Sequence, residues 1–386
     1  MRKGWEYKKL GEVCDVINGL WIGKKEPFIN VAVIRNTNFS KDCQLNLDKV
    51  AFIDVEVKQF ASKKLKFGDI IIEKSGGSEK QPVGRPILFN ISDGNYSFSN
   101  FTSTLRIKDN TEVNSAYLHK CLYAFYLKGE TIKLQSKTTG LHNLNIKGYL
   151  RLNIPLPPLS TQLAIVSELD KINELIRLKK EQLKDFDNLA QSLFYEMFGE
   201  GKCLRKKLKD IVKIQSGQVS PLEEPYSEMI HVGPANIESN TGRLLNLKTA
   251  KEENLISGKY LFNSSMVLYS KIRPNLNKVT IPSFEGICSA DMYPIIPLEC
   301  IDKNFLLFLL KQKEFLTYAI SNSGRANIPK INREALLNYE AILPPLSLQR
   351  LFAQRIEQIE REKSEVQKSI QDLETLLASR MQYWFE

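Results

Sequence analysis

The chain has 386 residues, a formal net charge of +10 and a hydrophobic content of 42%. This length fits two globular units joined by further segments, rather than one ordinary domain. No apolar run approaches the roughly 18 residues of a membrane span, and residues 1–6 contain no apolar signal region, so we expect a cytoplasmic protein that makes no membrane contact. The six cysteines include no Cys-x-x-Cys pair, and neither a zinc site nor a disulfide framework is predicted.

Residues 1–155 are predicted to form a first α+β body. Residues 8–19 are expected to begin as a short basic helix and continue as a strand that ends at a glycine turn. Residues 67–76 are typical of a buried strand that runs into a polar loop, and residues 114–127 have the apolar spacing of a helix. A basic loop at residues 137–143 follows.

Residues 156–199 are predicted to form one long helix. It follows Leu156-Pro157-Pro158-Leu159-Ser160-Thr161-Gln162 and ends at Gly199, and we expect Ser160 to accept first-turn amide hydrogens. About forty residues make a rod of roughly 60 Å. The apolar residues recur three and four positions apart, as in a heptad seam. They are Ile165, Leu169, Ile172, Ile176, Leu183, Phe186, Ala190, Leu193 and Met197.

The second half of the chain repeats this plan. Residues 200–342 are predicted to form a second α+β body, in which residues 206–217 align without a gap with residues 8–19. Residues 266–274 resemble the earlier strand-to-loop segment, residues 304–320 have helical spacing, and residues 323–330 form a basic loop. The last segment, 343–386, begins Leu343-Pro344-Pro345-Leu346-Ser347-Leu348-Gln349 and aligns with the first long helix at an offset of 187 residues.

The gapless repeat favours pairing of the two long helices over two helices that cover separate cores. The seam continues through Phe352, Ile356, Ile359, Val366, Ile370, Leu373, Leu377 and Trp384. Since the order is body, rod, body, rod, we expect an antiparallel coiled coil and an approximate two-fold axis that relates the halves.

Charge is divided unevenly between rods and bodies. Residues 160–200 hold five Lys/Arg against eight Asp/Glu, and residues 347–386 hold six against seven, so the rods carry −4 and the remaining chain +14. Basic bodies on acidic rods favour polyanion binding by the bodies and protein contacts along the rods. An excess of lysine also serves plain solubility, and charge alone leaves both interpretations open.

The repeated Leu-Pro-Pro-Leu-Ser-x-Gln start of a long helix, the duplicated body-and-rod plan and the strand-to-loop segments resemble the specificity subunit of Type I restriction-modification systems. The resemblance spans essentially the whole chain. It implies that the bodies are target recognition domains, each of which reads one half of an interrupted sequence in double-stranded DNA. It also implies that the rods dock two methyltransferase subunits, and that restriction (translocase/endonuclease) subunits join through the complex.

Under this hypothesis, loop side chains with Lys, Arg, His, Asn or Ser character contact the DNA. The candidates in the first body are Lys74, Ser75, Lys80, Arg85, Lys137, His142 and Asn143, and those in the second are Ser270, Lys271, Arg273, Asn275, Arg325, Asn327 and Lys330. Apolar residues off the seam are the candidates for partner binding. They are Leu163, Leu175, Leu189, Phe194 and Tyr195.

Catalytic interpretations are weaker. Residues 19–25 resemble a phosphate-binding loop, but three residues separate the glycines where four are required. Asp48 with the Glu56-Val57-Lys58 run is a weak nuclease-like pattern, and three isolated histidines do not favour a metal or triad site. We therefore predict a non-enzymatic protein without cofactor or metal, to which partners supply methyl transfer. The alternative is a coiled-coil adaptor that holds two protein-binding modules and never touches DNA.

Overall fold

The computed structural model describes residues 4–21, 23, 25–79, 81–109, 111–138, 141–199, 203–324 and 327–385. It divides into two compact units. Unit 1 consists of Met1–Lys180 together with Lys368–Glu386, and unit 2 of Glu181–Gln367. Both units mix helix and strand, and each contains one half of both long helices.

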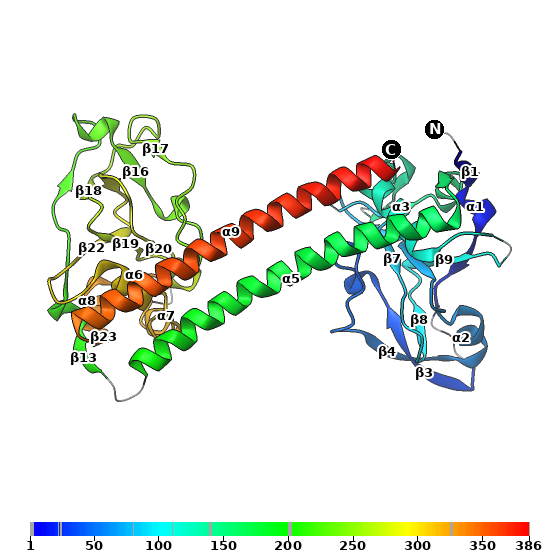
Figure 1. The fold of residues 1–386 in the computed structure, drawn as a ribbon, viewed down its shortest axis with the longest axis horizontal. Helices are drawn as coiled ribbons and strands as arrows, with labels where there is room; N and C mark the ends of the chain where they lie inside the picture. The colour runs from blue at the N-terminus through cyan, green and yellow to red at the C-terminus, as the bar shows by residue number, and fades with distance from the viewer. Residues whose placement is uncertain are drawn as a thin grey trace. The chain divides into compact units, whose positions relative to one another are not determined.

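Unit 1 is built on an antiparallel sheet whose strand order is β2-β9-β5-β7. The strands are β2 (Cys14–Asn18), β9 (Thr102–Ile107), β5 (Ile70–Glu73) and β7 (Pro86–Leu88). As expected, β5 is buried on both faces: Ile70 and Ile72 pack beneath α3 (Ser115–Leu127), whereas Ile71 points into a second core with Phe98. Figure 1 shows α3 beside β7.

A second sheet in unit 1 has the order β4-β3-β8. Its strands are β4 (Ala51–Glu56), β3 (Phe28–Ile34) and β8 (Tyr96–Phe98). β3 pairs antiparallel with β4 and parallel with β8. β4 lies at the edge of this sheet (Figure 1). It carries the exposed side chains of Phe52 and Ile53.

The chain begins differently from the prediction for residues 8–19. Lys8 and Lys9 belong to β1 (Glu6–Lys9), which pairs with β12 (Asn153–Leu156), and only the single turn α1 (Leu10–Val13) precedes β2. The expected basic helix is therefore wrong, because these lysines lie in a strand ladder. The other elements of unit 1 are η1 (Asn36–Asn38), α2 (Val57–Lys63), β6 (Ser75–Gly77), η2 (Ile132–Leu134), β10 (Gln135–Thr138), β11 (Leu141–Leu144) and α4 (Ile146–Tyr149).

Unit 2 repeats this architecture. Its antiparallel sheet has the order β14-β22-β19-β20, and a second sheet has the order β15-β18-β21-β16-β17. The first consists of β14 (Val212–Ile214), β22 (Met292–Pro297), β19 (Val267–Ser270) and β20 (Val279–Thr280). The second consists of β15 (Gln218–Val219), β18 (Lys259–Phe262), β21 (Gly286–Cys288), β16 (Ile230–Val232) and β17 (Lys248–Thr249). β5 and β19 occupy the same place in their sheets, as their sequence likeness predicts.

Two differences distinguish the second repeat. β15 and β18 extend its second sheet beyond the strand that corresponds to β8. The helix expected over residues 304–320 is broken at Gln312, which separates α6 (Lys303–Lys311) from α7 (Lys313–Ser321). The other elements are β13 (Leu204–Lys207), η3 (Leu208–Asp210), η4 (Tyr226–Glu228), η5 (Pro234–Asn236), η6 (Pro274–Leu276), α8 (Arg333–Asn338) and β23 (Glu340–Leu343).

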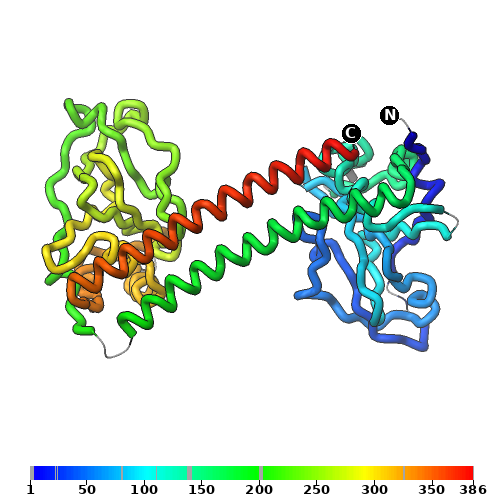
Figure 2. The backbone as a smooth tube through the Cα atoms, in the orientation of Figure 1, coloured from blue at the N-terminus to red at the C-terminus, as the bar shows by residue number. Residues whose placement is uncertain are grey.

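The long helices α5 (Leu159–Phe198) and α9 (Leu346–Phe385) are confirmed as antiparallel neighbours in each unit. In unit 1, Glu168 pairs with Arg380 and Lys180 with Glu374, so the partner number falls as the α5 number rises. The end of α9 accordingly lies beside the first half of α5 (Figure 2). In unit 2 the same direction follows from the Lys363–Asp187 ion pair and from the contact of Phe352 with Phe194.

The start of each long helix is held by glutamine rather than by the expected serine. Helix α5 already begins at Leu159, and the amides of Thr161 and Gln162 donate to the Pro158 carbonyl, so Ser160 lies inside the first turn. Gln162 is buried; its Oε1 accepts from the Asn114 amide at 2.9 Å, and its Nε2 donates to the Glu112 and Pro157 carbonyls. Gln162 therefore ties the start of α5 to the start of α3.

Gln349 makes the equivalent bonds in unit 2. It accepts from the Asp302 amide at 2.8 Å and donates to the carbonyls of Cys300 and Pro344. The last residue of the repeated motif thus fastens α5 to the start of α3 and α9 to the start of α6.

Candidate nucleic-acid interface

The small sheet β10-β11-β6 gathers several of the predicted DNA-binding residues of unit 1. Residue 143 in β11 is directly opposite residue 75 in β6. The Ser75 hydroxyl donates to Asn143 Oδ1 at 2.6 Å, and His142 Nδ1 lies 2.8 Å from Gln135 Oε1. The structure therefore brings together polar side chains that are 68 positions apart in the sequence.

Lys74 lies between β5 and β6 beside this sheet. Its backbone amide donates to the Phe101 carbonyl at 2.9 Å, and its side chain is half-buried. Burial, together with the nearby Lys63 cation, lowers the pKa of the Lys74 ammonium. Within the described residues no carboxylate pairs with this ammonium, so a bound anion would relieve the cost of its partial burial.

The Arg85 side chain lies inside unit 1 rather than at its surface. Its guanidinium is buried in an ion pair with Glu73, with 2.6 Å between Nε and Oε2, and it also donates to the Phe39 carbonyl. Both charged side chains are withdrawn from solvent, so the Arg85–Glu73 ion pair is part of the buried interior of unit 1. We leave Arg85 out of the candidate interface.

In unit 2 the corresponding loops also meet. Ile272 forms an isolated bridge with Lys330, and the Arg273 amide donates to the Pro329 carbonyl at 2.7 Å. Arg273 has a left-handed backbone with φ of 48°, a conformation that a non-glycine residue seldom adopts. These contacts bring the backbones at Arg273 and Lys330 close together, and both side chains are exposed.

The other candidates of unit 2 divide into exposed and internal groups. Asn275 and Asn327 are exposed. Ser270 is buried and donates to the Ile272 carbonyl, while the Lys271 ammonium donates to the Ala290 carbonyl and lies over the Tyr293 ring. Ser270 and Lys271 therefore stabilise the loop through internal hydrogen bonds.

Some predicted residues lie outside the described part of the chain. These are Lys80, Arg325 and the side chain of Lys137, whose backbone belongs to β10. The same holds for Ile22 and Lys24 of the phosphate-loop-like stretch.

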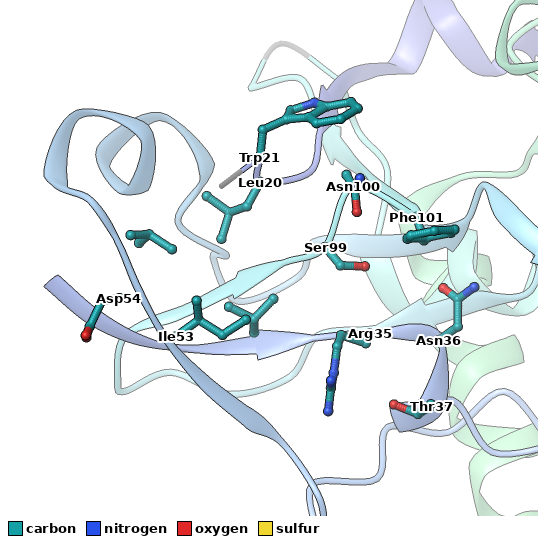
Figure 3. Close-up of a pocket in the computed structure, with 12 residues that line it drawn as sticks. Leu20, Trp21, Arg35, Asn36, Thr37, Ile53, Asp54, Ser99, Asn100 and Phe101 are labelled. Atoms are coloured by element: carbon teal, nitrogen blue, oxygen red, sulfur yellow. The ribbon is translucent and has the colours of Figure 1, made fainter. Parts of the chain in front are cut away.

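A hollow in unit 1, not predicted from the sequence, lies next to the β10-β11-β6 sheet. It has a volume of about 330 Å³, and Figure 3 shows Leu20 and Trp21 on one side of it and Ile53 on the other. Asn36 and Phe101 connect it to the sheet, since Asn36 Nδ2 donates to the Ser75 carbonyl at 2.6 Å. A Cβ at Gly76 would lie 3.1 Å from that amide nitrogen, and Gly76 has a φ of 102° that favours glycine.

The hollow depends on a close backbone approach at Gly19. Leu20 bridges in parallel to Ser99, and a Cβ on Gly19 would lie only 1.8 Å from the Ser99 carbonyl oxygen. The glycine that the sequence suggested as a turn thus lets one wall of the hollow form. Its lining comes from four separated segments, so no local sequence pattern predicted it.

A family model for the Type I restriction modification DNA specificity domain matches residues 2–185 and again residues 204–375. Both repeats, and most of the chain, are covered. The chain belongs to this family. Its two units are thus two copies of the specificity domain, in agreement with the resemblance drawn from the repeated helix starts.

Relatives of this specificity subunit support the assignment. The specificity subunit of the Type I restriction enzyme EcoDI of Escherichia coli is 34% identical over 193 residues, which span 50% of this chain and 40% of that relative. The putative MjaX specificity subunit of Methanocaldococcus jannaschii is 22% identical over 97% of this chain and 92% of its own length. The chain thus matches less than half of the first relative and nearly all of the second.

Solved structures agree on the fold. A chain from a structure of the type I R-M system has a TM-score of 0.63 at 17% identity and covers 100% of this chain and 98% of its own. The S subunit of the Type I system of M. genitalium has a TM-score of 0.56 at 15% identity and covers 98% and 95%.

The long helices of the specificity subunit expose most of the predicted partner-binding residues. Leu163, Leu175, Leu189 and Tyr195 have exposed side chains. Phe194, predicted to lie off the seam, is instead buried against Phe198 and Phe352 in the core of unit 2. Its assignment to a partner surface was wrong, because the end of α5 packs against α6 and α9 over more than its seam.

The described residues were also compared with the requirements of a metal site and of a membrane-spanning helix. Across the part of the chain that the structure describes, no three His, Cys, Asp or Glu side chains gather closely enough to hold a metal ion. Every helix within the described ranges is too short or too polar to cross a bilayer.

Proposed function

We propose that this specificity subunit binds double-stranded DNA, with each unit reading one half of a bipartite target. The observation that carries the proposal is the repetition of one specificity domain, with equivalent loops that hold polar and cationic side chains, half-buried in unit 1 and exposed in unit 2. In unit 1 these are Lys74, Ser75, His142 and Asn143. In unit 2 they are Arg273, Asn275, Asn327 and Lys330.

The cationic and the polar side chains of these loops suit different kinds of DNA contact. Lysine and arginine side chains neutralise phosphates and position the protein, and amide and hydroxyl groups distinguish base edges. The +14 charge outside the two helical segments would draw DNA to the bodies. Exposed Arg273 and Lys330 fit phosphate contacts, whereas Ser75 and Asn143 fit a base edge.

We further propose that the long helices carry two methyltransferase subunits on the exposed surface marked by Leu163, Leu175, Leu189 and Tyr195. Restriction subunits would join through the complex. The chain itself is non-catalytic in this proposal, and its partners supply methyl transfer and cleavage.

The test of DNA binding compares charge removals of equal size. In the complex with its methyltransferase subunits, Arg273→Ala and Lys330→Ala should each weaken binding of the target duplex and lower the slope of log K against log salt by about one. Lys251→Ala is the matched control, since Lys251 is an exposed lysine of unit 2 that pairs with Glu228 at 2.8 Å. If binding were absent or independent of salt, the adaptor alternative would replace this proposal.

A further inference from the structure

The hollow of unit 1 combines exposed aromatic walls with a neighbouring cation. Trp21 is 65% exposed and Phe101 is 44% exposed, although both flank an apolar surface that Leu20 and Ile53 continue (Figure 3). Large aromatic side chains left open around an apolar hollow mark a binding site. Its volume of about 330 Å³ is also sufficient for a small ring system.

We propose that this hollow receives one DNA base that has left the helical stack, with Trp21 and Phe101 stacking on it and Lys74 binding an adjacent phosphate. The inference rests on the proposed function, because it assigns a place on unit 1 to the DNA that the unit would read. In this proposal, unit 1 binds one extruded base in addition to contacting base edges within the duplex.

The polar residues that line the hollow include side-chain atoms without partners. Asn36 Oδ1 and Ser99 Oγ are buried and have no hydrogen-bond partner among the described residues. The Asn100 amide also lines the hollow, and its side chain makes no hydrogen bond within the described ranges. Buried polar groups without partners are uncommon and call for a ligand or water, and a base offers donors and acceptors in one plane.

The Lys74 backbone lies beside the aromatic wall of the hollow. Lys74 and Ser75 both donate their backbone amides to the Phe101 carbonyl, so the cation and the aromatic wall belong to one local structure. A planar apolar ring held by aromatic side chains, with an anion beside it, is the pattern of single-stranded nucleic acid recognition. An apolar side chain of a protein partner would fit the walls but would leave the half-buried cation without a counterion.

This hollow distinguishes the two units. In unit 2, β18 and β15 add strands beyond β21, on the side where unit 1 has the Leu20–Ser99 bridge. The extruded base is therefore assigned to the half-site of unit 1 alone.

The experiment measures affinity of the full chain, in complex with its methyltransferase subunits, for duplexes that carry the mapped target. Each base pair of the unit 1 half-site is replaced in turn by a mismatch that keeps one strand unchanged. A mismatch weakens base pairing and lowers the cost of extrusion, so binding should tighten at one position other than the methylated base. If unit 1 reads only stacked base pairs, a mismatch should weaken binding at every such position. Trp21→Ala and Phe101→Ala should each abolish this tightening and lower affinity about tenfold.

Three controls make the outcome decisive. Phe67→Ala removes an aromatic side chain that is 68% exposed and lies outside the hollow, and should leave the tightening intact. Trp21→Phe keeps a stacking ring and should retain most of it, and equal unfolding temperatures exclude loss of fold. Mismatches at the methylated base also tighten binding, because a methyltransferase extrudes that base, but this effect should survive Trp21→Ala.

The inference is overturned if no position tightens, or if every tightening survives both alanine variants, while the complex still binds its target specifically. It is also wrong if Trp21→Ala lowers recovery of the methyltransferase and leaves DNA affinity unchanged, since the hollow would then dock protein. Loss of all specific DNA binding by the unmodified complex would instead contradict the proposed function.

Discussion

The Trp384 indole donates its N–H to the Glu168 carboxylate at 3.0 Å, although 216 positions separate the two residues. Arg380 donates to the same carboxylate, and these hydrogen bonds lower the pKa of Glu168. Trp384 also stacks on Trp5, with ring planes 9° apart. The two ends of the chain and the first half of α5 therefore meet in unit 1.

Removal of residues 380–386 should unfold or strongly destabilise unit 1. Met381 and Phe385 are buried in its core, and loss of large core side chains costs about 2–5 kcal/mol each. Hydrogen exchange measured by mass spectrometry should show faster exchange in α3 and β5 but not in β19 of unit 2. As a milder variant, Trp384→Phe keeps the stacked ring, loses the N–H donor and should cost about 1 kcal/mol. Unchanged protection of α3 in the truncated protein would contradict this account.

Gln162→Met should destabilise unit 1 by about 2–5 kcal/mol, because the Asn114 amide and two carbonyls lose their buried partner. Denaturant unfolding measures the change. Gln349→Met should have the same effect on unit 2, and Ser167→Ala, an exposed change on α5, serves as the control. Equal stability of Gln162→Met and the control would show that the glutamine link is dispensable.

His119 should make unit 1 sensitive to mild acid. Burial, helped by the Lys120 cation, lowers its pKa to about 4, below the usual 6.5. Between these values the unfolded chain binds a proton that the folded chain does not, so stability falls as pH drops from about 6.5 towards 4. From pH 7.5 to 5.5 the wild-type protein should lose about 1 kcal/mol more than His119→Gln in denaturant titrations. Parallel pH profiles for the two proteins would refute this assignment.

Leu175→Glu combined with Leu189→Glu should abolish co-purification with the methyltransferase. Both leucines are exposed, so the charges should leave the subunit folded while they oppose an apolar contact. Leu222→Glu places the same charge at an exposed leucine of unit 2 away from the long helices. A double variant that still recovers the methyltransferase as the wild type does would remove this surface from the proposal.

Periodic features were predictable from the sequence. Ile165 and Leu169 are fully buried as the heptad spacing requires, because side chains three or four apart share a helix face. The offset of 187 residues between the two motifs also predicted Gln162 and Gln349 as equivalents. Their role in fastening the long helices was not predicted. The amides that donate to them lie 47 or 48 positions away, and local sequence spacing does not reveal such distant contacts.

Features that depend on long-range packing were predicted poorly. Arg85 was selected as a loop cation, yet its pairing with Glu73 depends on the meeting of β5 with β7. Phe194 is off the seam by periodicity but faces a core that α6 completes. The hollow near Trp21 was missed altogether, since its walls come from segments brought together only by the sheet β4-β3-β8.

In the function proposed above, each unit reads its own half of the target. To test this directly, residues 1–155 are replaced with the corresponding body of a related specificity subunit. The methylated sequence is then mapped in cells that also express the methyltransferase. If each unit reads its own half-site, one half of the methylated sequence should change and the other half should stay as it was. A change in both halves together, or in neither, would contradict it.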